Sequence, residues 1–246
     1  MKLGILEAGD VVPDLAARHG DYPAMFRALL SDADPAIEFE TVHVVAGEMP
    51  ESPDQADAWL VTGSRHGVYD DLPWIEPLKA FLRDCMEQKV PVVGICFGHQ
   101  ILAEAMGGKA EKSDRGWRLG RQNYAVVQRP EWMTQVPDHY FVLALHQDQV
   151  TKLPPNSSVL AVNSHCEYAA LAYGDIEDPD AITVQPHPEF GPKFMDELLR
   201  LRRDKPIPSS FVDEALENLD GPLHADNWAK TIVDFLRRKA ASRAAA

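Results

Sequence analysis

The chain has 246 residues, of which 45% are hydrophobic, so it can bury the core of one large domain or of a domain with an appendage. Its 38 Asp and Glu residues outnumber its 24 Lys and Arg residues, and the net charge of −14 argues against nucleic acid or an anionic membrane as a partner. Three cysteines, no apolar leader and no apolar run of membrane length predict a cytoplasmic protein without a disulfide framework.

The first hundred residues alternate between short apolar strands and helices. The predicted strands are 2–7, 39–45, 58–62 and 90–93. The predicted helices are 24–30, 75–88 and 101–106, and a loop is expected over 11–23. This alternation is typical of an α/β fold with a mostly parallel central sheet and helices on both faces. Reactive side chains should then gather at the carboxyl ends of the strands.

After residue 106 the predicted strands become shorter and are divided by Pro, Asp, Asn and Gly turns. They are 122–128, 139–145, 158–163, 167–173 and 181–185. We expect them to extend the sheet in a more antiparallel arrangement.

The chain becomes helical from Pro192 onward, with predicted helices near 193–204, 210–219 and 225–239. The last helix carries an apolar stripe that predicts packing on the core, formed by Trp228, Ile232, Phe235 and Leu236. We therefore expect a main domain over 1–192 and a C-terminal helical extension over 193–246, packed on the same domain.

Cys96 lies in the pattern Gly94-Ile95-Cys96-Phe97-Gly98, between an apolar strand and a helix. Glycines two places before and two places after the cysteine allow a sharp bend and close packing, as in a nucleophile elbow. The bend would expose the thiol, and the N–H groups that begin the next helix would favour a negatively charged sulfur. The alternative is an inert cysteine buried in a tight connection. We predict that Cys96 is a nucleophile.

A cysteine nucleophile needs a base, and the base needs a group that orients it. The segment Gln185-Pro186-His187-Pro188-Glu189 supplies both. Prolines on each side of His187 favour extended backbone, in which side chains two apart share a face, so Glu189 can reach the imidazole ring. The alternative is a rigid surface turn with an incidental histidine. Together with the elbow, the segment predicts a triad of Cys96, His187 and Glu189.

Thioester chemistry also needs N–H donors for a developing oxyanion. In an elbow, one donor is the N–H of the residue after the nucleophile, here Phe97. A second donor is expected from the glycine-bearing loop 62–71 at the end of the third strand, around Gly63 and Ser64. The alternative for this loop is an ordinary turn from strand to helix.

Two polar stretches remain. Leu145-His146-Gln147-Asp148-Gln149-Val150 could bind the amino and carboxylate groups of a substrate, or could simply close a strand. Asn163-Ser164-His165-Cys166-Glu167-Tyr168 contains residue types that bind metals, but the chain has no H-E-x-x-H and no C-x-x-C motif. We predict no metal site and no cofactor.

The elbow, the T-G-S loop, the H-x-D-x-V stretch and the Q-P-H-P-E segment together resemble the class I glutamine amidotransferases. Residues 1 to about 192 are similar to the glutaminase domain of GMP synthase and its free-standing relatives. The resemblance implies a flavodoxin-like class I glutaminase fold and a Cys96, His187 and Glu189 triad. It also implies that Gln100 and the backbone around Ser64 and Leu145–Gln147 hold glutamine.

The sequence departs from the family pattern at three points. Arg65 replaces the proline of the family's T-G-S-P loop, which leaves open whether the oxyanion donor is preset. Leu145 stands where GMP synthase has serine, so only backbone contacts carry over there. No S-G-G-x-D-S loop of an ATP-pyrophosphatase domain is present, so we do not expect a complete synthetase.

The predicted function is hydrolysis of the γ-amide of glutamine, or of a γ-glutamyl compound, through a cysteine thioester. Two alternatives share the elbow: a glutaminase subunit that delivers ammonia to a partner synthetase, and a cysteine peptidase or γ-glutamyl peptide hydrolase of related fold. Arg65 and His66 beside the expected pocket could meet the extra carboxylate of a γ-glutamyl peptide, or could be solvated loop residues. A non-catalytic regulator is the third alternative, and the complete triad argues against it.

Overall fold

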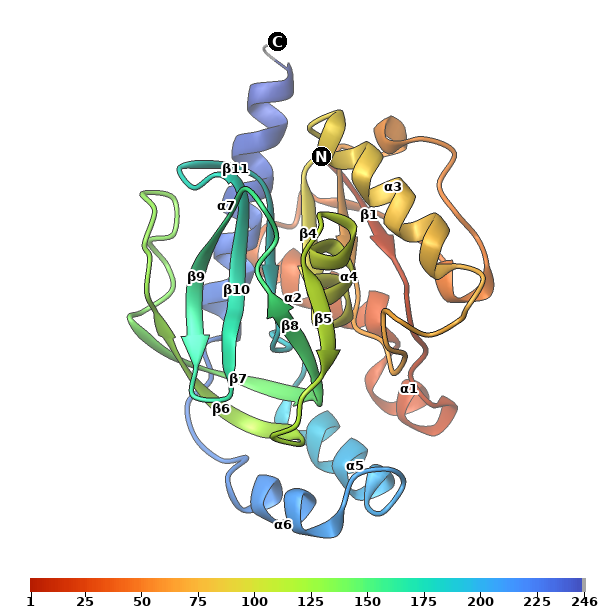
Figure 1. The fold of residues 1–246 in the computed structure, drawn as a ribbon, viewed down its shortest axis with the longest axis vertical. Coiled ribbons are helices and arrows are strands. Elements are labelled where there is room, and N and C mark those ends of the chain that lie inside the picture. The colour runs from red at the N-terminus through yellow and green to blue at the C-terminus, as the bar shows by residue number, and fades with distance from the viewer. Residues whose placement is uncertain (245–246) are drawn as a thin grey trace.

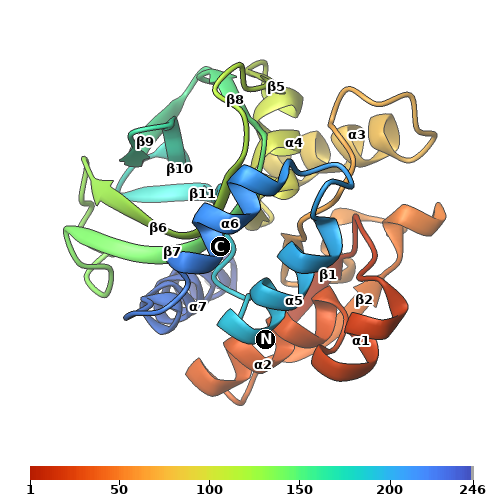
Figure 2. The same cartoon turned by 90° about the horizontal axis from the view of Figure 1, so that it is seen from below.

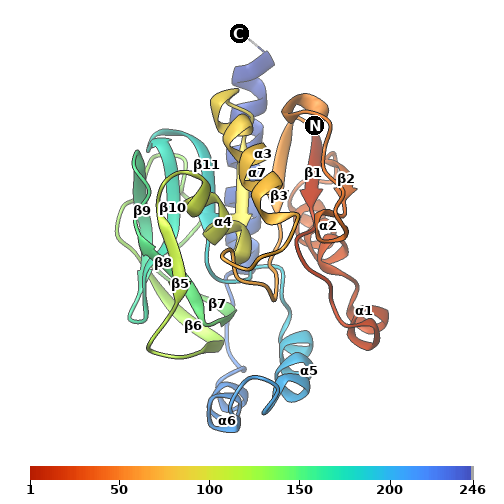
Figure 3. The same ribbon diagram turned by 45° about the vertical axis from the view of Figure 1, so that its right-hand side comes forward.

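The computed structural model describes residues 1–244, and its central feature is a nine-stranded sheet (Figure 1). Five adjacent strands run parallel, in the order β2 (Glu38–Val42), β1 (Lys2–Leu6), β3 (Ala58–Val61), β4 (Val92–Ile95) and β11 (Asp178–Val184). Four antiparallel strands follow, in the order β10 (Cys166–Asp175), β9 (Ser157–Asn163), β6 (Arg118–Val126) and β7 (His139–His146). Figure 3 shows these two halves on opposite sides of the molecule.

Helices cover both faces of the parallel half. One face packs against α2 (Tyr22–Ala33) and α7 (Ala225–Ala244). The other face packs against α3 (Ile75–Glu87) and α4 (Phe97–Ala105). A separate two-stranded sheet, β5 (Lys109–Lys112) and β8 (Asp148–Lys152), lies beside α4. The predicted α/β class and the predicted change from parallel to antiparallel pairing are both confirmed.

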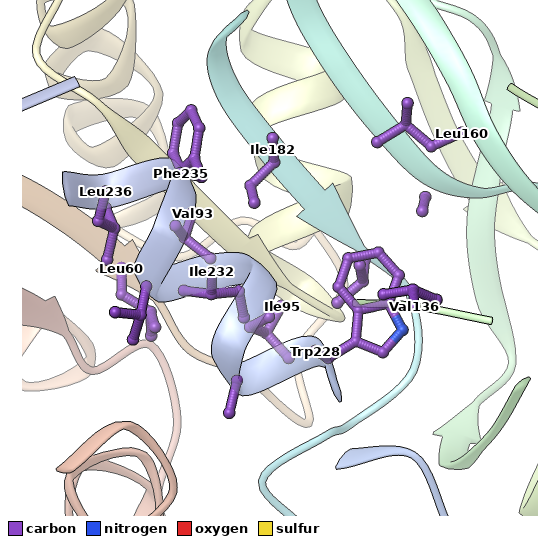
Figure 4. Packing of buried hydrophobic residues seen from close by; sticks show 14 of the residues in the cluster. Leu60, Val93, Ile95, Val136, Leu160, Ile182, Trp228, Ile232, Phe235 and Leu236 are labelled. Atoms are coloured by element: carbon purple, nitrogen blue, oxygen red, sulfur yellow. The ribbon is translucent and has the colours of Figure 1, made fainter. Parts of the chain in front are cut away.

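The apolar stripe of α7 packs onto the sheet, as its spacing predicted. Trp228, Ile232 and Leu236 are at most 1% exposed and belong to the cluster that contains Val93 and Ile95 of β4. Figure 4 shows these side chains facing the central strands. The last helix is therefore part of the main core.

The two preceding helices lie elsewhere. α5 (Pro192–Arg202) and α6 (Ser209–Glu217) lie at the end of the molecule opposite the chain termini (Figure 1). Figure 2 shows the two helices from below. α5 packs beside α1 (Pro13–His19), and α6 packs against β6. None of the helices within residues 1–244 is both long and apolar enough to cross a membrane. The division of the chain at residue 192 stays a prediction. The last two residues of the predicted extension, 245 and 246, lie outside the described residues.

Several elements differ from the predicted ones. The expected loop 11–23 contains α1, which begins at a proline but buries only Leu15 and so lacks a helical stripe. Strands β5 and β8 were not predicted because their pairing joins distant segments with few apolar residues. The predicted strand 39–45 ends at Val42, and short 3₁₀ turns follow at Val44–Ala46 and Pro53–Gln55. The elbow strand is shifted to Val92–Ile95, and α4 begins at Phe97, four residues earlier than predicted.

Ile232→Ala should lower the free energy of unfolding by about 2–5 kcal/mol, because it leaves a cavity between α7 and the sheet. Urea unfolding measures this loss. The control is Lys230→Ala on the exposed side of the same helix, which should change the free energy of unfolding by less than about 0.5 kcal/mol. Equal small losses would contradict the assignment of α7 to the core.

Candidate active site

Cys96 occupies the bend between β4 and α4, with φ 52° and ψ −97°. This positive φ is unfavourable for a residue with a side chain and costs roughly 1–3 kcal/mol. The bend is held by close packing: a Cβ on Gly94 would lie 2.5 Å from the carbonyl oxygen of Gly98, and a Cβ on Gly98 would clash with the carbonyl oxygen of Val61. Both glycines are thus required by the approach of α4 to β3 and β4.

His187 is held above this bend by its neighbours on several sides. Its backbone N–H donates to the carbonyl oxygen of Leu143 on β7, 2.8 Å away. Its Nδ1 lies 2.7 Å from Oε1 of Glu189, and its ring stacks on Phe190 with 4.0 Å between centroids. A Cβ on Gly63 would lie 2.7 Å from the Cε1 atom of His187, so only glycine fits behind the ring.

The electrostatics of this cluster favour a charged imidazole. Burial alone would lower the pKa of His187, but the Glu189 carboxylate and the nearby Cys96 sulfur raise it to about 10. Cys96, His187 and Glu189 are at most 8% exposed, so water screens these interactions poorly. The prediction that the bend exposes the thiol is wrong, since Cys96 is only 5% exposed beneath the residues that line the cleft. The geometry therefore suits an imidazolium that lies between a carboxylate and a sulfur.

Two other histidines near the site stay neutral. Burial lowers the pKa of His146 to about 3, and likewise the pKa of His99. His99 Nδ1 contacts the Thr183 hydroxyl at 2.7 Å, and His146 Nδ1 contacts the carbonyl oxygen of Asp148 at 3.0 Å. Of these buried histidines, His187 alone has a carboxylate partner within residues 1–244, which makes it the basic group of the site.

A chain of amide hydrogen bonds supports the sulfur from the other side. Gln185 Nε2 lies 3.6 Å from the Cys96 sulfur, and its Oε1 accepts from Gln100 Nε2 at 3.1 Å. Gln100 Nε2 also donates to the carbonyl oxygen of Asp148 at 2.9 Å, so its two amide hydrogens are used and its oxygen is left for a ligand. Gln185 was predicted only as a strand end, and its position directly before the Pro-His-Pro-Glu segment is the signal that could have singled it out.

A cleft of about 410 Å³ opens above Cys96. Most predicted site residues line it, namely Ser64, Cys96, Gln100, Leu145, His146, Gln147 and His187. Glu189 and Gly63 instead lie behind the His187 ring. The side chain of Phe97 is buried 5.5 Å from the Trp74 ring, which leaves only its backbone to serve the site. The catalytic and binding roles assigned from the sequence stay predictions.

The rim of the cleft contains residues that the sequence did not single out. The cations Lys112 and Arg202 join Arg65 around the opening, and none of the three forms an ion pair within residues 1–244. Tyr69 donates to Asp148 Oδ2 at 2.8 Å, which ties the loop after β3 to the start of β8. The sequence singled out Arg65 and the two stretches that contain Tyr69 and Asp148, but it gave no signal for Lys112 or Arg202, which come from other, distant segments.

The family model "Glutamine amidotransferase class-I" matches residues 40–202, about two thirds of the chain. The chain belongs to this family. Among curated members, it is 29% identical over 231 residues to γ-glutamyl peptidase 4 of Arabidopsis thaliana, covering 90% of this chain and 89% of the relative. It is 32% identical over 123 residues to a glutamine-hydrolyzing GMP synthase subunit of Methanopyrus kandleri, covering 46% of this chain and 62% of that one. These relatives point to a hydrolase-type enzyme.

Solved structures confirm the class I amidotransferase fold. A glutamine amidotransferase from Methylobacillus flagellatus superposes with a TM-score of 0.73 at 20% identity, covering 96% of this chain and 94% of the other. A glutamine amidotransferase from Thermotoga maritima superposes with a TM-score of 0.71 at 19% identity, covering 98% of this chain and 97% of the other. The alignments span nearly the whole chain, so helices α5 to α7 fall within the aligned fold.

The stability of the protein should fall as the pH rises from about 6.5 to about 10. The pKa of His187 is raised from 6.5 to about 10 on folding, so in this window the folded state holds a proton that the unfolded state has lost. The stabilisation of the folded state by protonated His187 is complete below about pH 6.5 and lost above about pH 10. Glu189→Gln removes a carboxylate that raises this pKa and should flatten the slope of unfolding free energy against pH. His139→Asn, at an exposed site, should leave the slope unchanged, and an unaltered slope in Glu189→Gln would refute the pairing.

Proposed function

We propose that this amidotransferase-family enzyme hydrolyses the γ-amide bond of γ-glutamyl compounds through a thioester on Cys96, and that γ-glutamyl peptides are at least as good substrates as glutamine. The observation that carries the proposal is the buried contact of His187 Nδ1 with Glu189 Oε1 at 2.7 Å, at a cleft that His187 and Cys96 line together. This arrangement is the one that a cysteine nucleophile, its base and an orienting carboxylate require.

The reaction would proceed in two steps. The Cys96 thiolate attacks the γ-carbonyl carbon, the C–N bond breaks, and the leaving amine takes a proton from the His187 imidazolium. A γ-glutamyl thioester remains. His187 then takes a proton from water, whose oxygen attacks the thioester carbon, and glutamate leaves as the sulfur regains its electron pair. Glu189 keeps the imidazole oriented and stabilises its charge in both steps.

The oxyanion formed in each step needs nearby N–H donors. The N–H of Phe97 is in the first turn of α4, where backbone donors lack intrahelical acceptors. A second donor would come from Gly63 or Ser64, which the packing of Gly63 on the His187 ring brings beside the cleft. The oxygen of Gln100 and the backbone of Leu145 to Gln147 would bind the amino and carboxylate groups of the glutamyl part.

The choice of substrate rests on charge. Arg65, Lys112 and Arg202 outnumber Asp70 and Asp148 at one cleft of a chain whose net charge is −14. A γ-glutamyl peptide carries a second carboxylate on its leaving group, whereas glutamine does not, so the rim cations would favour the peptide. Similarity to γ-glutamyl peptidase 4 over most of both chains supports the same choice.

The second candidate function is an ammonia-delivering glutaminase subunit. The similarity to the Methanopyrus kandleri protein favours it, since that relative is by name a separate part of GMP synthase. In that case the partner would be a synthetase, and hydrolysis would depend on its presence. Activity of the isolated protein distinguishes the two candidates.

Cys96→Ala should be folded and should lower kcat by about 10⁴-fold or more, because no other thiol can replace the nucleophile. Cys85→Ala and Cys166→Ala are the matched controls and should keep activity, because burial raises the pKa of each thiol to about 12 and holds it protonated. Release of glutamate from a γ-glutamyl peptide measures turnover, and circular dichroism checks folding. Retained activity in Cys96→Ala would exclude the thioester route.

The isolated protein should hydrolyse γ-glutamyl dipeptides with kcat/KM at least equal to that for glutamine. Arg65→Ala should lower kcat/KM for the peptide by about two- to fivefold, the weak effect of an exposed cation, and should leave glutamine unaffected. Preference for glutamine in both wild type and variant would reject the peptide hypothesis. Activity that appears only after a synthetase is added would favour the second candidate.

A further inference from the structure

A second cavity of about 320 Å³ lies next to the catalytic cleft, between β6 and α6. Trp117 lines both cavities and forms their common wall. Strand β6 pairs with β9 only at Ala125 and Val126. The earlier residues of β6 have no β9 partner on that edge of the strand, and several of them line the cavity. The mechanism proposed above uses none of the other residues that line the second cavity.

Arg118 is the unusual group in this cavity. It is half-buried, and its Nε atom is buried without a hydrogen-bond partner within residues 1–244. Its Nη2 reaches Nδ1 of His165 at 2.5 Å and Oγ of Ser164 at 3.3 Å, both of them neutral acceptors, and no carboxylate forms an ion pair with it in the described chain. Its Nη1 also forms no hydrogen bond within residues 1–244 and, unlike Nε, is not buried, so the guanidinium keeps its charge and the Nη1 N–H groups for a planar acceptor such as a carboxylate.

His165 adds a second donor to the cavity. Burial, together with the nearby Arg118 and Arg115 cations, lowers the pKa of His165 and keeps it neutral. Its Nδ1 accepts from Arg118, so the proton of the neutral ring sits on Nε2, which can donate to a ligand. Arg121 is already engaged, because its Nε donates to the carbonyl oxygen of Pro222 and its guanidinium lies over the Phe141 ring. Glu214 is the carboxylate on the cavity wall, and it is exposed to water.

The position of Arg118 links the cavity to the reaction. Arg118 lies directly opposite His146 in the ladder between β6 and β7, and His146 lines the catalytic cleft. Directly opposed residues of an antiparallel pair lie on the same face of the sheet, with Cβ atoms roughly 5 Å apart. A leaving group that extends from Cys96 past His146 and Trp117 would therefore meet Arg118.

We propose that the second cavity binds the terminal carboxylate of the leaving group of an extended γ-glutamyl substrate, through Arg118 and the Nε2–H of His165. The proposal rests on the hydrolytic function proposed above and assigns the substrate class as γ-glutamyl compounds whose leaving amine ends in a carboxylate. Exposed cations such as Arg65 interact weakly because water screens them, whereas a half-buried guanidinium with an unused N–H forms a stronger, directional contact.

The test compares γ-glutamyl-alanyl-glycine with its C-terminal carboxamide and with glutamine, in wild type and variants. Arg118→Met should lower kcat/KM about tenfold or more for the carboxylate substrate, and less than twofold for the carboxamide and for glutamine. Arg118→Lys should recover part of the loss, since it keeps the charge without the planar pair of donors. Glu214→Gln removes a nearby negative charge and should raise kcat/KM for the carboxylate substrate alone.

Arg83→Met, an exposed cation on α3, is the control for net charge and should leave all three rates unchanged. Equal losses for the three substrates in both Arg118 variants would mean that Arg118 acts only structurally, and would overturn the inference. Unchanged rates in Arg118→Met would overturn it as well. If wild type hydrolyses all three substrates but treats carboxylate and carboxamide alike, the inference fails while the proposed function stands. If wild type hydrolyses none of them, both fail.

Discussion

The close packing of α4 against β3 and β4 is the constraint on which the site depends. It forces Cys96 into a positive φ and leaves no room for a side chain at Gly94 or Gly98. As a result, the sulfur stands at the beginning of a helix, above the carboxyl end of a central strand, where backbone dipoles and neighbouring loops converge. A small relaxation of this packing would move the sulfur away from His187.

The two halves of the sheet meet at this point and each supplies part of the site. The parallel half positions Cys96 and, through the close approach of Gly63, one side of the His187 ring. The antiparallel half fixes the backbone of His187 through Leu143 on β7 and carries His146 to the cleft. The antiparallel extension therefore helps to build the cleft, and α6 packs against its strand β6.

Charge is distributed unevenly over the molecule. The chain as a whole is strongly acidic, yet cations outnumber carboxylates at the cleft above Cys96 and in the neighbouring cavity, where the carboxylates are Asp70, Asp148 and Glu214. These cations differ in burial: Arg65 is exposed to water, which screens its charge, whereas Arg118 is half-buried. This distribution of positive charge would suit the proposed substrate, which has anionic groups at both ends.

The α/β class and the change from parallel to antiparallel strands could be predicted from the sequence, because helix and strand patterns depend on residues close together in the chain. The elbow glycines and the Pro-His-Pro-Glu segment carry their geometry within a few residues, so Cys96, His187 and Glu189 could be predicted to act together. The distant groups that surround these three residues become visible only in the folded chain. Gln185 against the sulfur, the rim cations, and Arg118 opposite His146 depend on strand register and helix packing, which no local pattern encodes.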